Sequence, residues 1–572
     1  MTPTDTYLGL RAFTDELARC GITDACTSPG SRSTPLVLSL AREPRLRATS
    51  HLDERSGAFF ALGLAKATGR PAVLACTSGT AAANYAPAVI EAYEARVPLL
   101  VLTADRPPEL RDLGAGQTID QVKLFGRAAK WFLEVDDAPA TPQRLRWLRQ
   151  LACRAVHTAV SGRPGPVHLN FALREPLVLE AELPPAGGGR AGGRPWVDVR
   201  PAMAVPDGRR IEALARALHD AQRPLVVAGR LERAGAGEAV AAFARRLRVP
   251  LLADPLSGAR RGEAIAHYDA YLRDAGWAAA HQPDLVLRIG DLPTSKPLRT
   301  WLAGLPDDVR QVALDPEAAW QDPSASVHEI LPADPVVALA ILDVAPNGEE
   351  WLGAWRRADA AAIEAFGRLL SGPELSEPLV AARTAARLGG RDALVVAASM
   401  PVRDLETFMV AVHSPPRVLA NRGANGIDGT ASTALGVAAA TAGTTVLLTG
   451  DVALLHDLGG LLATTRAGVR LVVVLIDNDG GGIFHFLPVA TQADHFTEHV
   501  ATPHGIDFAA AAALYGLGHE LAEDLAGFDA ALERAYTAER STIVQVRTAR
   551  NANVELHRNV WAAVAESVRR GA

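Results

Sequence analysis

Short apolar runs recur along the chain and alternate with segments of helical length, in three successive blocks. The first block contains DACTS, RATSHL, PAVLACT, PLLVLTA and PGPVHLNF. The second contains RPLVVAG, VPLLAD, DLVLRIG and VRQVALD, and the third ALVVAAS, RVLANRG, TTVLLTGD, LVVVLIDN and STIVQVRT. This alternation is typical of parallel strands joined by crossover helices. It predicts an α/β fold with three doubly wound domains whose sheets are mostly parallel.

Composition and length place the domain boundaries. The stretch PPAGGGRAGGRP, which begins at residue 184, is too poor in apolar residues to form a core and predicts a linker. We expect a first domain at 1–183, a linker at 184–199, a central α/β domain at 200–345, a helical connector at 346–377 and a third domain at 378–572. A chain of 572 residues is long enough for each domain to bury its own core.

Charge and hydropathy exclude several classes of protein. A net charge of −6 argues against a general nucleic-acid binder. No apolar run approaches the roughly 20 residues of a membrane span, and MTPTDTYLGLRAF lacks the regions of a signal peptide. We therefore expect a cytoplasmic protein without a nucleic-acid or membrane partner. Cys20, Cys26, Cys76 and Cys153 have no metal-type spacing, and we interpret them as buried thiols in a reducing compartment.

Two strand ends in the third block carry oxygen ligands. Gly450 and Asp451 follow one apolar run, and Asn478 follows the next, with a crossover helix expected at about 456–467. Parallel neighbours bring their carboxyl ends together at the edge where open α/β sheets bind ligands. Asp451, Asn478 and carbonyls of the glycine-rich turn, Gly480 among them, therefore predict a Mg²⁺ site that holds a diphosphate. The absence of GxGxxG and GxxxxGK[ST] argues against a nicotinamide dehydrogenase or a P-loop enzyme.

Reactive side chains also follow the strands of the first block: Ser31 and Arg32, Glu54, Ser78 and Gly79, Arg106, and Gln117. Gly79 opens an expected helix whose free amides suit an anionic group. Glu54 heads a helical segment in which Gly57, Ala61 and Ala65 form a small-residue stripe, suited to close packing at a subunit interface. Taken alone, a glutamate at this place is more often only a partner of the helix dipole.

Together these segments resemble the thiamine-diphosphate enzymes, in which Gly-Asp is followed by an asparagine about 27 positions later. SPGSRSTPL, HLDERSGAFFALGLAKATGRP, TSGTAAANYAPAVIEA, TADRPPELRDLGAGQTIDQ, NRGANGIDGT and IDNDGGGIFHFLP are similar to the menaquinone-pathway branch of that family, and the resemblance covers essentially the whole chain. It implies a thiamine-diphosphate-binding fold, with a pyrimidine-binding first domain and a diphosphate-binding third domain. It also implies thiamine diphosphate with Mg²⁺ or Mn²⁺, and a transferase that decarboxylates 2-oxoglutarate and adds the carbanion to isochorismate.

The resemblance also implies roles for residues. Glu54 would hydrogen-bond the aminopyrimidine ring of a cofactor bound to a neighbouring subunit, which implies a homodimer or homotetramer. Ile427 would press beneath the cofactor to hold its rings in a V. The residues implied to contact the cofactor are Glu54, Ser78, Gly79, Ile427, Gly450, Asp451, Asn478, Gly480, Gly482, Ile483, Phe484 and Leu487.

Both implied substrates are dicarboxylates, which the planar fork of arginine binds bidentately. The residues implied to act in catalysis beside Glu54 are Ser31, Arg32, Arg106, Gln117, Ser399, Arg403 and Arg422. Ser399 and Arg403 are four positions apart and are expected to share a helical turn.

Two positions depart from the usual pattern of the family. Gly116 stands before Gln117 where an asparagine is usual, and Pro297 follows Lys296 where a second basic residue is usual. The contribution of each position to substrate binding is therefore in doubt.

Two other functions stay open at this stage. One is a different thiamine-diphosphate 2-oxoacid decarboxylase or carboligase, whose small substrates would not call for four arginines. The other is an inactive relative kept as a binding protein, which would be expected to have lost Glu54, Asp451 or Asn478. All three are present. The resemblance implies that Ile483, Phe484 and Leu487 form an apolar wall of the site, but these residues are also compatible with ordinary core.

Overall fold

The structure, a computed structural model, describes residues 2–179, 182–183, 187–200, 202–492 and 494–570. Residues 184–186 of the predicted linker lie outside the described residues. The chain divides into two compact units. Unit 1 comprises Met1–Ala202, Asn421–Thr441 and Leu455–Arg470, and unit 2 comprises Met203–Ala420, Ala442–Leu454 and Leu471–Ala572. The predicted boundaries at 183, 199, 345 and 377 remain predictions.

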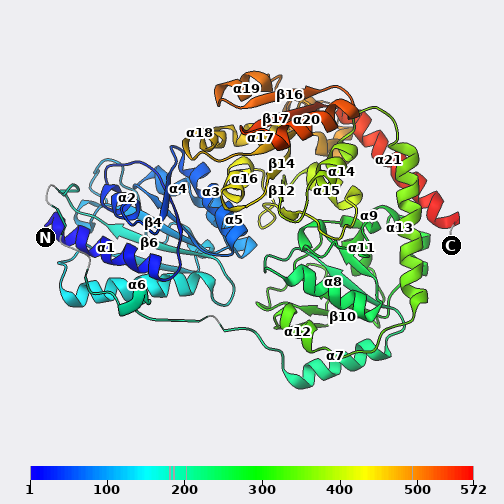
Figure 1. Cartoon of the computed structure of the whole chain (residues 1–572), viewed down its shortest axis with the longest axis horizontal. Coiled ribbons are helices and arrows are strands. Elements are labelled where there is room, and N and C mark those ends of the chain that lie inside the picture. The colour runs from blue at the N-terminus through cyan, green and yellow to red at the C-terminus, as the bar shows by residue number, and fades with distance from the viewer. Residues whose placement is uncertain (1, 180–181, 184–186, 201, 493, 571–572) are drawn as a thin grey trace. The chain divides into compact units, whose positions relative to one another are not determined.

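Unit 1 is built on a six-stranded parallel sheet of order β2-β1-β3-β4-β6-β5 (Figure 1). The strands are β1 Asp24–Thr27, β2 Arg47–Ser50, β3 Ala72–Cys76, β4 Leu99–Asp105, β5 Trp131–Val135 and β6 Pro166–Ala172. Helices α1 (Pro3–Arg19), α2 (Thr34–Ala41) and α6 (Pro142–Val160) share a core with Val73 and Ala75 of β3. Leu74 lies between these two residues and points to the other face. That face is covered by α3 (Glu54–Thr68) and α5 (Ala86–Ala95), so the sheet is doubly wound.

Local interactions fix the ends of α3 and its packing. Asp53 caps the helix by accepting a hydrogen bond from the Arg55 N–H at 2.8 Å, and Gly69 ends it with a φ of 69°. Helix α3 packs on α16 (Thr430–Ala440), where a Cβ on Gly63 would lie 2.1 Å from the Thr433 carbonyl oxygen. This close approach rests on Gly63, a residue outside the small-residue stripe that the sequence suggested.

Unit 2 contains two further parallel sheets (Figure 1). The first has the order β11-β10-β9-β7-β8, with β7 Pro224–Ala228, β8 Leu251–Ala253, β9 Leu285–Ile289, β10 Arg310–Leu314 and β11 Glu329–Leu331. The second has the order β13-β12-β14-β15-β17-β16, with β12 Ala393–Val396, β13 Arg417–Leu419, β14 Thr445–Gly450, β15 Val472–Asp477, β16 Gly518–Ala522 and β17 Thr542–Arg547. The predicted α/β class with three doubly wound, parallel sheets is confirmed.

Helices cover both faces of the five-stranded sheet. One core joins the sheet to α7 (Gly208–Asp220), α8 (Ala236–Leu247) and α12 (Pro335–Ile341). A second core contains α9 (Tyr268–Tyr271), α10 (Ala275–Ala280), α11 (Lys296–Ala303), α13 (Glu349–Leu369) and α21 (Arg550–Arg570). Helix α13 lies within the predicted helical connector.

The six-stranded sheet of unit 2 has a core with α14 (Glu377–Arg387), α15 (Met400–Phe408) and α20 (Leu525–Thr537). Helix α19 (Phe508–Leu514) packs beside β16. The expected continuous helix at about 456–467 is wrong: the chain forms α17 (Asp451–His456), η5 (Leu458–Leu462) and α18 (Ala463–Arg466) instead. Gly459 and Gly460 lie within η5, and glycine disfavours a continuous α-helix.

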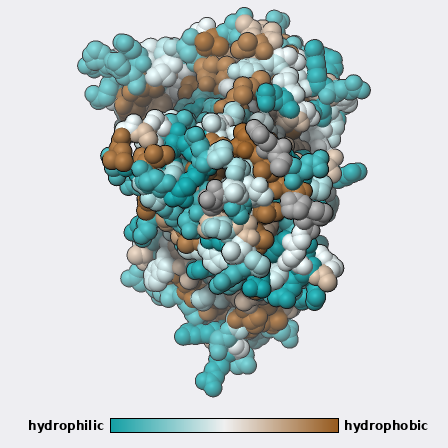
Figure 2. All heavy atoms as spheres, turned by 90° about the vertical axis from the view of Figure 1, so that its left-hand side faces the viewer, coloured by the Kyte–Doolittle hydropathy of each residue, from teal (hydrophilic) through white to brown (hydrophobic). Residues whose placement is uncertain are grey.

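The surface of the described residues mixes polar and apolar groups. On the face shown in Figure 2, apolar residues occur in groups among polar ones. None of the helices in the described ranges combines the length with the apolar character that crossing a membrane demands.

Candidate active site

Asp451 and Asn478 meet at the carboxyl ends of adjacent strands in unit 2, as the sequence predicts. Strands β14 and β15 are parallel neighbours, and Gly450 pairs with Ile476. Asp451 follows β14 directly, begins α17 and is 2% exposed. Its Oδ2 accepts hydrogen bonds from the backbone N–H of Asn478 at 3.2 Å and of Gly480 at 2.9 Å. The two loops therefore wrap around one buried carboxylate.

The side chain of Asn478 is oriented by Glu377, a residue that the sequence analysis missed. Asn478 Nδ2 donates to Glu377 Oε1 at 3.0 Å, where α14 begins. Glu377 also accepts from Thr548 Oγ1 at 2.9 Å, and burial raises the pKa of Glu377 to about 7. Asn478 Oδ1 is left buried without a hydrogen-bond partner among the described residues. In the sequence, Glu377 looks like an ordinary acidic residue in the first turn of a helix.

His504 and Arg550 hold the same turn, and the sequence analysis missed both. His504 Nε2 lies 3.2 Å from Asp451 Oδ2. Arg550 Nη1 donates to the Asn478 carbonyl at 2.8 Å and also to the carbonyl of Asp479. Burial raises the pKa of Asp451, while its backbone donors and His504 oppose that rise.

These groups fit a divalent cation. Asp451 supplies a carboxylate, and Asn478 Oδ1 is a buried acceptor without a partner in the described part of the chain. The carbonyl of Gly480, which accepts from the Gly482 N–H at 2.9 Å, is a third oxygen of the turn. Buried acceptors are normally paired, and oxygen donors of this kind are those that Mg²⁺ prefers. Gly480 has a φ of 136°, and a Cβ there would lie 2.2 Å from the Ala501 carbonyl oxygen, so the turn requires glycine.

An apolar segment follows the turn. Gly482 begins the 3₁₀ helix η6 (Gly482–Phe486), and a Cβ on it would lie 2.7 Å from Asn478 Nδ2. Ile483 is half-buried, whereas Phe484 is 37% and Leu487 46% exposed. The alternative that these residues are ordinary core is therefore wrong for Phe484 and Leu487. Exposed apolar side chains beside a polar turn suit one wall of a binding site.

Ser399 and Arg403 share the first turn of α15, as predicted. Ser399 is the residue before the helix, and Arg403 Nη1 donates to its carbonyl at 2.5 Å. Desolvation of the guanidinium, and then the positive charge of Arg299 on α11, lower the pKa of Arg403. Arg299 Nε is buried without a hydrogen-bond partner among the described residues. The basic residue expected at Pro297 is thus absent there, but Arg299 supplies a cation two positions later.

In unit 1, the ends of β3 and β4 bring Ser78, Arg106 and Gln117 together. Arg106 donates to Ser78 Oγ, which donates to the Gln117 carbonyl at 3.0 Å. Gln117 Nε2 donates to the Ser78 carbonyl, also at 3.0 Å. The Gly79 N–H donates to Gln121 Oε1 at 2.9 Å, so this amide is not free as expected. The helix after it, α4 (Thr80–Ala83), has only four residues.

Ser31 and Arg32 lie at the end of β1 in the same unit. Ser31 is exposed, whereas Arg32 is 7% exposed. Arg32 donates from Nη1 to the Leu173 carbonyl at 3.0 Å and from Nη2 to Glu175 Oε1 at 3.1 Å. Burial, and then the charge of Arg32, lower the pKa of Arg106, so the two cations act on each other at this edge. Paired guanidinium groups suit a dicarboxylate.

Glu54 is half-buried and is the first residue of α3, as predicted. The residues after it are anchored to the segment that follows α17. Arg55 Nη2 donates to the His456 carbonyl at 2.9 Å, and Ser56 Oγ donates to Asp457 Oδ1 at 3.3 Å. Burial raises the pKa of Asp457 to about 6. These contacts fix the direction in which α3 begins and therefore the position of Glu54.

Arg422 and Ile427 belong to a loop of unit 1 and are half-buried. The loop is held by Glu91, whose Oε1 accepts from the Gly423 N–H at 2.9 Å. The Ile427 carbonyl accepts from Thr430 Oγ1 at 2.7 Å, where α16 begins. The residues assigned to one site by the sequence are therefore distributed over both units.

Comparison with known families covers most of the chain. Residues 9–124 match the N-terminal TPP binding domain of thiamine pyrophosphate enzymes, residues 193–396 match the middle domain, and residues 403–546 match the C-terminal TPP binding domain. The first and third matches contain Glu54 and the Asp451–Asn478 turn, respectively.

Curated relatives extend over nearly the full length and share one name, 2-succinyl-5-enolpyruvyl-6-hydroxy-3-cyclohexene-1-carboxylate synthase. The protein from Chloroflexus aurantiacus is 44% identical, with 97% of this chain and 96% of the relative covered. The protein from Geobacillus kaustophilus is 44% identical, with 97% of each covered. The protein from Halobacterium salinarum is 42% identical, with 96% of each covered. The chain therefore belongs to the thiamine-diphosphate-dependent 2-succinyl-5-enolpyruvyl-6-hydroxy-3-cyclohexene-1-carboxylate synthase family.

Proposed function

We propose that this chain decarboxylates 2-oxoglutarate and adds the resulting carbanion to isochorismate. The products are 2-succinyl-5-enolpyruvyl-6-hydroxy-3-cyclohexene-1-carboxylate and carbon dioxide, in menaquinone biosynthesis. The observation that carries the proposal is the 44% identity, over 97% of the chain, to relatives that bear the name of this synthase.

Thiamine diphosphate supplies the electron sink that makes loss of carbon dioxide possible. Asp451, Asn478 and the carbonyl of Gly480 would hold Mg²⁺, or Mn²⁺ in its place, against the diphosphate. The unpaired, buried Asn478 Oδ1 supports this assignment. Exposed Phe484 and Leu487 supply apolar surface beside the turn.

The chain's own polar groups would bind the substrates and move a proton. Glu54 would form a hydrogen bond with the aminopyrimidine ring of the cofactor. Its place at the start of α3 supports this role. Arg32 with Arg106 in unit 1, and Arg299 with Arg403 in unit 2, form two pairs of cations. After burial, the charge of the first cation of each pair lowers the pKa of the second. Such pairs suit substrates with two carboxylates each, because a guanidinium fork binds a carboxylate bidentately. Ser31, Gln117, Ser399 and Arg422 complete the proposed set.

We also propose a homodimer or homotetramer that works in the cytoplasm. The support for self-association is the resemblance stated above, in which a glutamate of one subunit serves the cofactor of another. An assembly that dissociates to a fully active monomer in sedimentation measurements would contradict it.

The test of the activity is carbon dioxide release from 2-oxoglutarate, followed with and without isochorismate, thiamine diphosphate and Mg²⁺. We expect release to depend on both cofactors, and the synthase product to appear only with isochorismate. Release from pyruvate in preference to 2-oxoglutarate would favour the alternative, another thiamine-diphosphate decarboxylase or carboligase. Retention of cofactor without turnover of either acid would indicate an inactive relative.

A matched pair of variants sharpens the test. Arg403→Ala removes a proposed substrate cation, whereas Arg216→Ala removes an exposed arginine of α7 that lies 3.9 Å from Glu212 in a surface ion pair. We expect Arg403→Ala to raise the KM for 2-oxoglutarate or for isochorismate. Arg216→Ala should leave both KM values unchanged, because exposed ion pairs of this kind contribute little to stability.

A further inference from the structure

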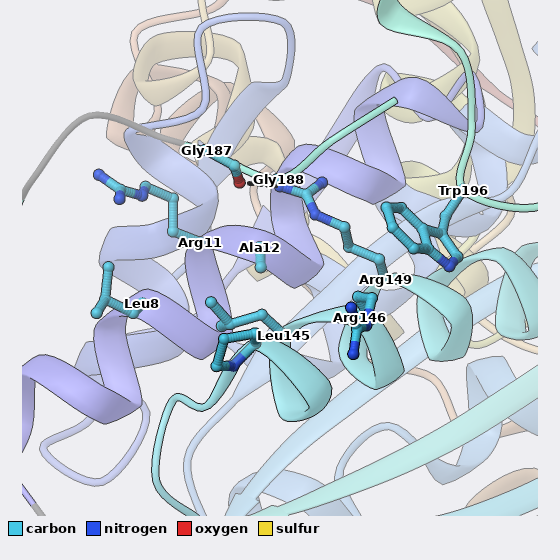
Figure 3. A pocket seen from close by; sticks show the side chains of 10 residues that line it. Leu8, Arg11, Ala12, Leu145, Arg146, Arg149, Gly187, Gly188 and Trp196 are labelled. Carbon is cyan, nitrogen blue, oxygen red and sulfur yellow. Dashed lines mark hydrogen bonds between the residues drawn. The ribbon is translucent and has the colours of Figure 1, made fainter. Parts of the chain in front are cut away.

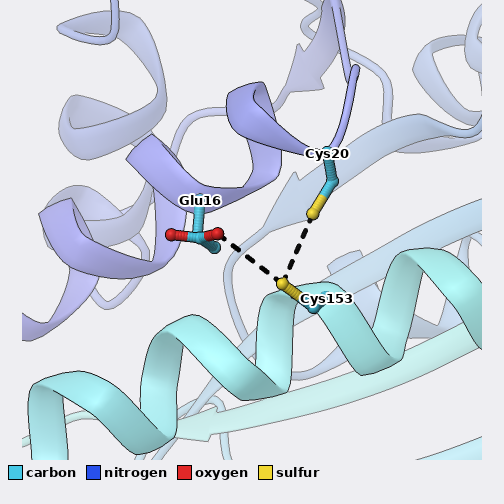
Figure 4. Close-up of side chains that lie close together, drawn as sticks. All are labelled: Glu16, Cys20 and Cys153. Carbon is cyan, nitrogen blue, oxygen red and sulfur yellow. Dashed lines mark hydrogen bonds between the residues drawn. The ribbon is translucent and has the colours of Figure 1, made fainter. Parts of the chain in front are cut away.

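Two cysteines of unit 1, which are 133 positions apart in the sequence, lie in contact. Cys20 follows the last residue of α1, and Cys153 lies on α6 (Figure 4). Their Sγ atoms are 3.6 Å apart, and Cys20 Sγ donates to Cys153 Sγ. Cys153 is buried as the sequence predicts, but Cys20 is half-buried, so that prediction is wrong for Cys20. The other two cysteines, Cys26 and Cys76, are buried in strands β1 and β3.

The backbone around Cys20 leaves room for a small movement. Cys20 stands where α1 ends, and Gly21 follows with a φ of 87° and no atom within 4 Å of where a Cβ would be. A helix end followed by an unobstructed glycine is easier to shift than a helix interior. The Sγ atoms can therefore approach to bonding distance through a local adjustment of Cys20.

Cys153, together with Glu16, also anchors the end of the predicted linker, at Trp196 and Val197. The Val197 N–H donates to Cys153 Sγ at 3.4 Å. Glu16 accepts a hydrogen bond from the Trp196 N–H and, at 3.6 Å, from Cys153 Sγ. Arg149 Nη1 donates to the other oxygen of Glu16 at 2.8 Å. The thiol pair, Glu16 and the backbone of residues 196–197 thus form one hydrogen-bonded group.

The same group borders a hollow of about 400 Å³ in unit 1. Figure 3 shows Arg149 and Trp196 on one side of it, with Arg11 and Leu145 on the others. The Gly187 carbonyl accepts from Arg149 Nη2 at 3.1 Å. A change at Cys153 would therefore reach the wall of this hollow through Glu16 and Arg149.

A metal ion is the other ligand that two thiols and a carboxylate suggest, since Glu16, Cys20 and Cys153 offer ligand atoms within 4.8 Å of one another. Both oxygens of Glu16 are already used, one by Arg149 and the other by the Trp196 N–H. The Arg149 cation beside the site also repels a second cation. These contacts favour sulfur chemistry over metal binding.

We propose that Cys20 and Cys153 form a reversible intramolecular disulfide by exchange with a low-molecular-weight disulfide, and that this releases the anchored segment at Val197. Cys20 Sγ attacks the reagent RSSR, its S–S bond breaks, and one RSH leaves with the Cys20 proton. Cys153 Sγ then attacks Cys20 Sγ in the mixed disulfide, and the second RSH leaves with the Cys153 proton. The two cysteines are oxidised, and the two sulfurs of RSSR are reduced.

The order of these steps follows from exposure and acidity. Of the two cysteines, only Cys20 is half-buried and so accessible to a low-molecular-weight disulfide, because Cys153 is buried. The first step is slow, because the hydrogen bond to Cys153 and burial raise the pKa of Cys20. The second step is fast, because it is intramolecular and the two sulfurs are already in contact. Disulfides of reducing compartments are typically transient and redox-sensing.

The test treats the full chain, with thiamine diphosphate and Mg²⁺ bound, with oxidised glutathione or with dithiothreitol. After denaturation and alkylation, we expect the four thiols of the reduced chain to fall to two. Peptide mapping should find one peptide that joins Cys20 to Cys153, while Cys26 and Cys76 stay alkylated. Dithiothreitol should restore all four thiols. A link between two chains, zinc that copurifies and protects both thiols, or persistence of four thiols would overturn the proposal.

Variants and hydrogen exchange test the two steps and the release separately. Cys153→Ser should stop at a stable glutathione adduct on Cys20, and Cys20→Ser should give no adduct at Cys153. Adduct formation at Cys153 in Cys20→Ser would overturn the order of steps. In the oxidised parent, the amides of Trp196 and Val197 should exchange faster than in the reduced parent. Unchanged exchange in a fully linked sample would overturn the release.

Discussion

Asn478 gives its side-chain N–H to Glu377 at 3.0 Å, and the same bond turns its Oδ1 into a buried oxygen without a partner among the described residues. An amide presents one donor end and one acceptor end, so fixing the donor fixes the acceptor. Glu377, on a helix that the sequence does not connect with the site, therefore prepares the oxygen that we assign to the metal. Groups behind a metal ligand commonly orient it in this way.

Replacing Glu377 by methionine should weaken the metal site without removing a ligand. Glu377→Met keeps a similar volume but cannot accept from Asn478, so the amide is free to rotate. Loss of such a supporting group typically costs about 10- to 100-fold in metal affinity. Titration calorimetry of Mg²⁺ in the presence of thiamine diphosphate measures this. Thr548→Val, which removes the other donor to Glu377, is the control, and an equal loss in both variants would contradict a specific role of the Asn478 contact.

Alanine at Gly480 should disrupt the turn that carries Asn478. The left-handed φ of 136° and a contact of 2.2 Å between a new Cβ and the Ala501 carbonyl oxygen both oppose a side chain here. We expect thiamine diphosphate retention on gel filtration to fall while far-ultraviolet circular dichroism stays that of the parent. Gly459→Ala adds a Cβ in open space and should retain cofactor normally. Normal retention by Gly480→Ala would show that the turn tolerates the change.

A methyl group at Gly63 should destabilise unit 1. Its Cβ would meet the Thr433 carbonyl oxygen of α16 at 2.1 Å, so α3 and α16 must separate. Overpacking of this kind costs about 1–3 kcal/mol. Gly367→Ala is the matched control, because it lies inside α13 with no atom within 4 Å, and it should stabilise the helix by about 0.5–1 kcal/mol. Thermal unfolding should therefore show a lower Tm for Gly63→Ala and a higher Tm for Gly367→Ala than for the parent. Shifts of Tm in the same direction for both variants would contradict the packing argument.

Asp457 should make the free energy of unfolding depend on pH between about 3.8 and about 6. Burial raises its pKa from 3.8 to about 6, so the folded chain keeps a proton that the unfolded chain has released. Its contribution to the free energy of unfolding is therefore full at low pH and is lost as the pH rises from about 3.8 to about 6. Asp457→Asn should flatten the pH dependence of Tm across that window. Asp220→Asn, at an exposed carboxylate, should leave the dependence intact. An unchanged slope in Asp457→Asn would mean that another group titrates there.

The sequence predicts the inner strands well and misses one edge strand in each sheet. Strands β5, β11 and β16 are edge strands, and most of their residues are only partly buried. They therefore lack the continuous apolar run of strands that are covered on both faces. The pairing of β14 with β15 was predictable because both strands are mostly apolar and buried and are followed directly by candidate ligands.

Some residues of the candidate site can be predicted from the sequence, and others cannot. Asp451 and Asn478 follow strands directly, so their meeting depends only on strand adjacency. Glu377 contacts Asn478 from a position 101 residues earlier in the chain. His504 contacts Asp451 from a position far later in the chain. Both contacts depend on tertiary packing, which no local sequence pattern encodes. Arg299 likewise affects Arg403 from a helix of the other sheet in unit 2: after burial, its positive charge lowers the pKa of Arg403.

The last prediction concerns Glu54, whose role as proton partner of the cofactor is still a proposal. Glu54→Gln should fold, because the amide nearly matches the carboxylate in volume and the residue is half-buried at a helix start. The amide loses the charged acceptor, and charge-assisted hydrogen bonds are about twice as strong as neutral ones. Acid–base groups typically contribute about 10²- to 10⁴-fold, so turnover should fall on that scale.

Where that loss appears distinguishes the proposed role from the alternatives. If Glu54 promotes removal of the proton from the reactive carbon of the cofactor, exchange of that proton should slow together with both half-reactions. Magnetic resonance of the bound cofactor measures the exchange directly, and Asp53→Asn, which alters the cap of the same helix, controls for a displaced α3. Normal exchange with slow turnover would place Glu54 at a later step. If neither changes, Glu54 is only a partner of the α3 dipole, because such a partner affects helix stability by about 0.3–1 kcal/mol and leaves the chemistry alone.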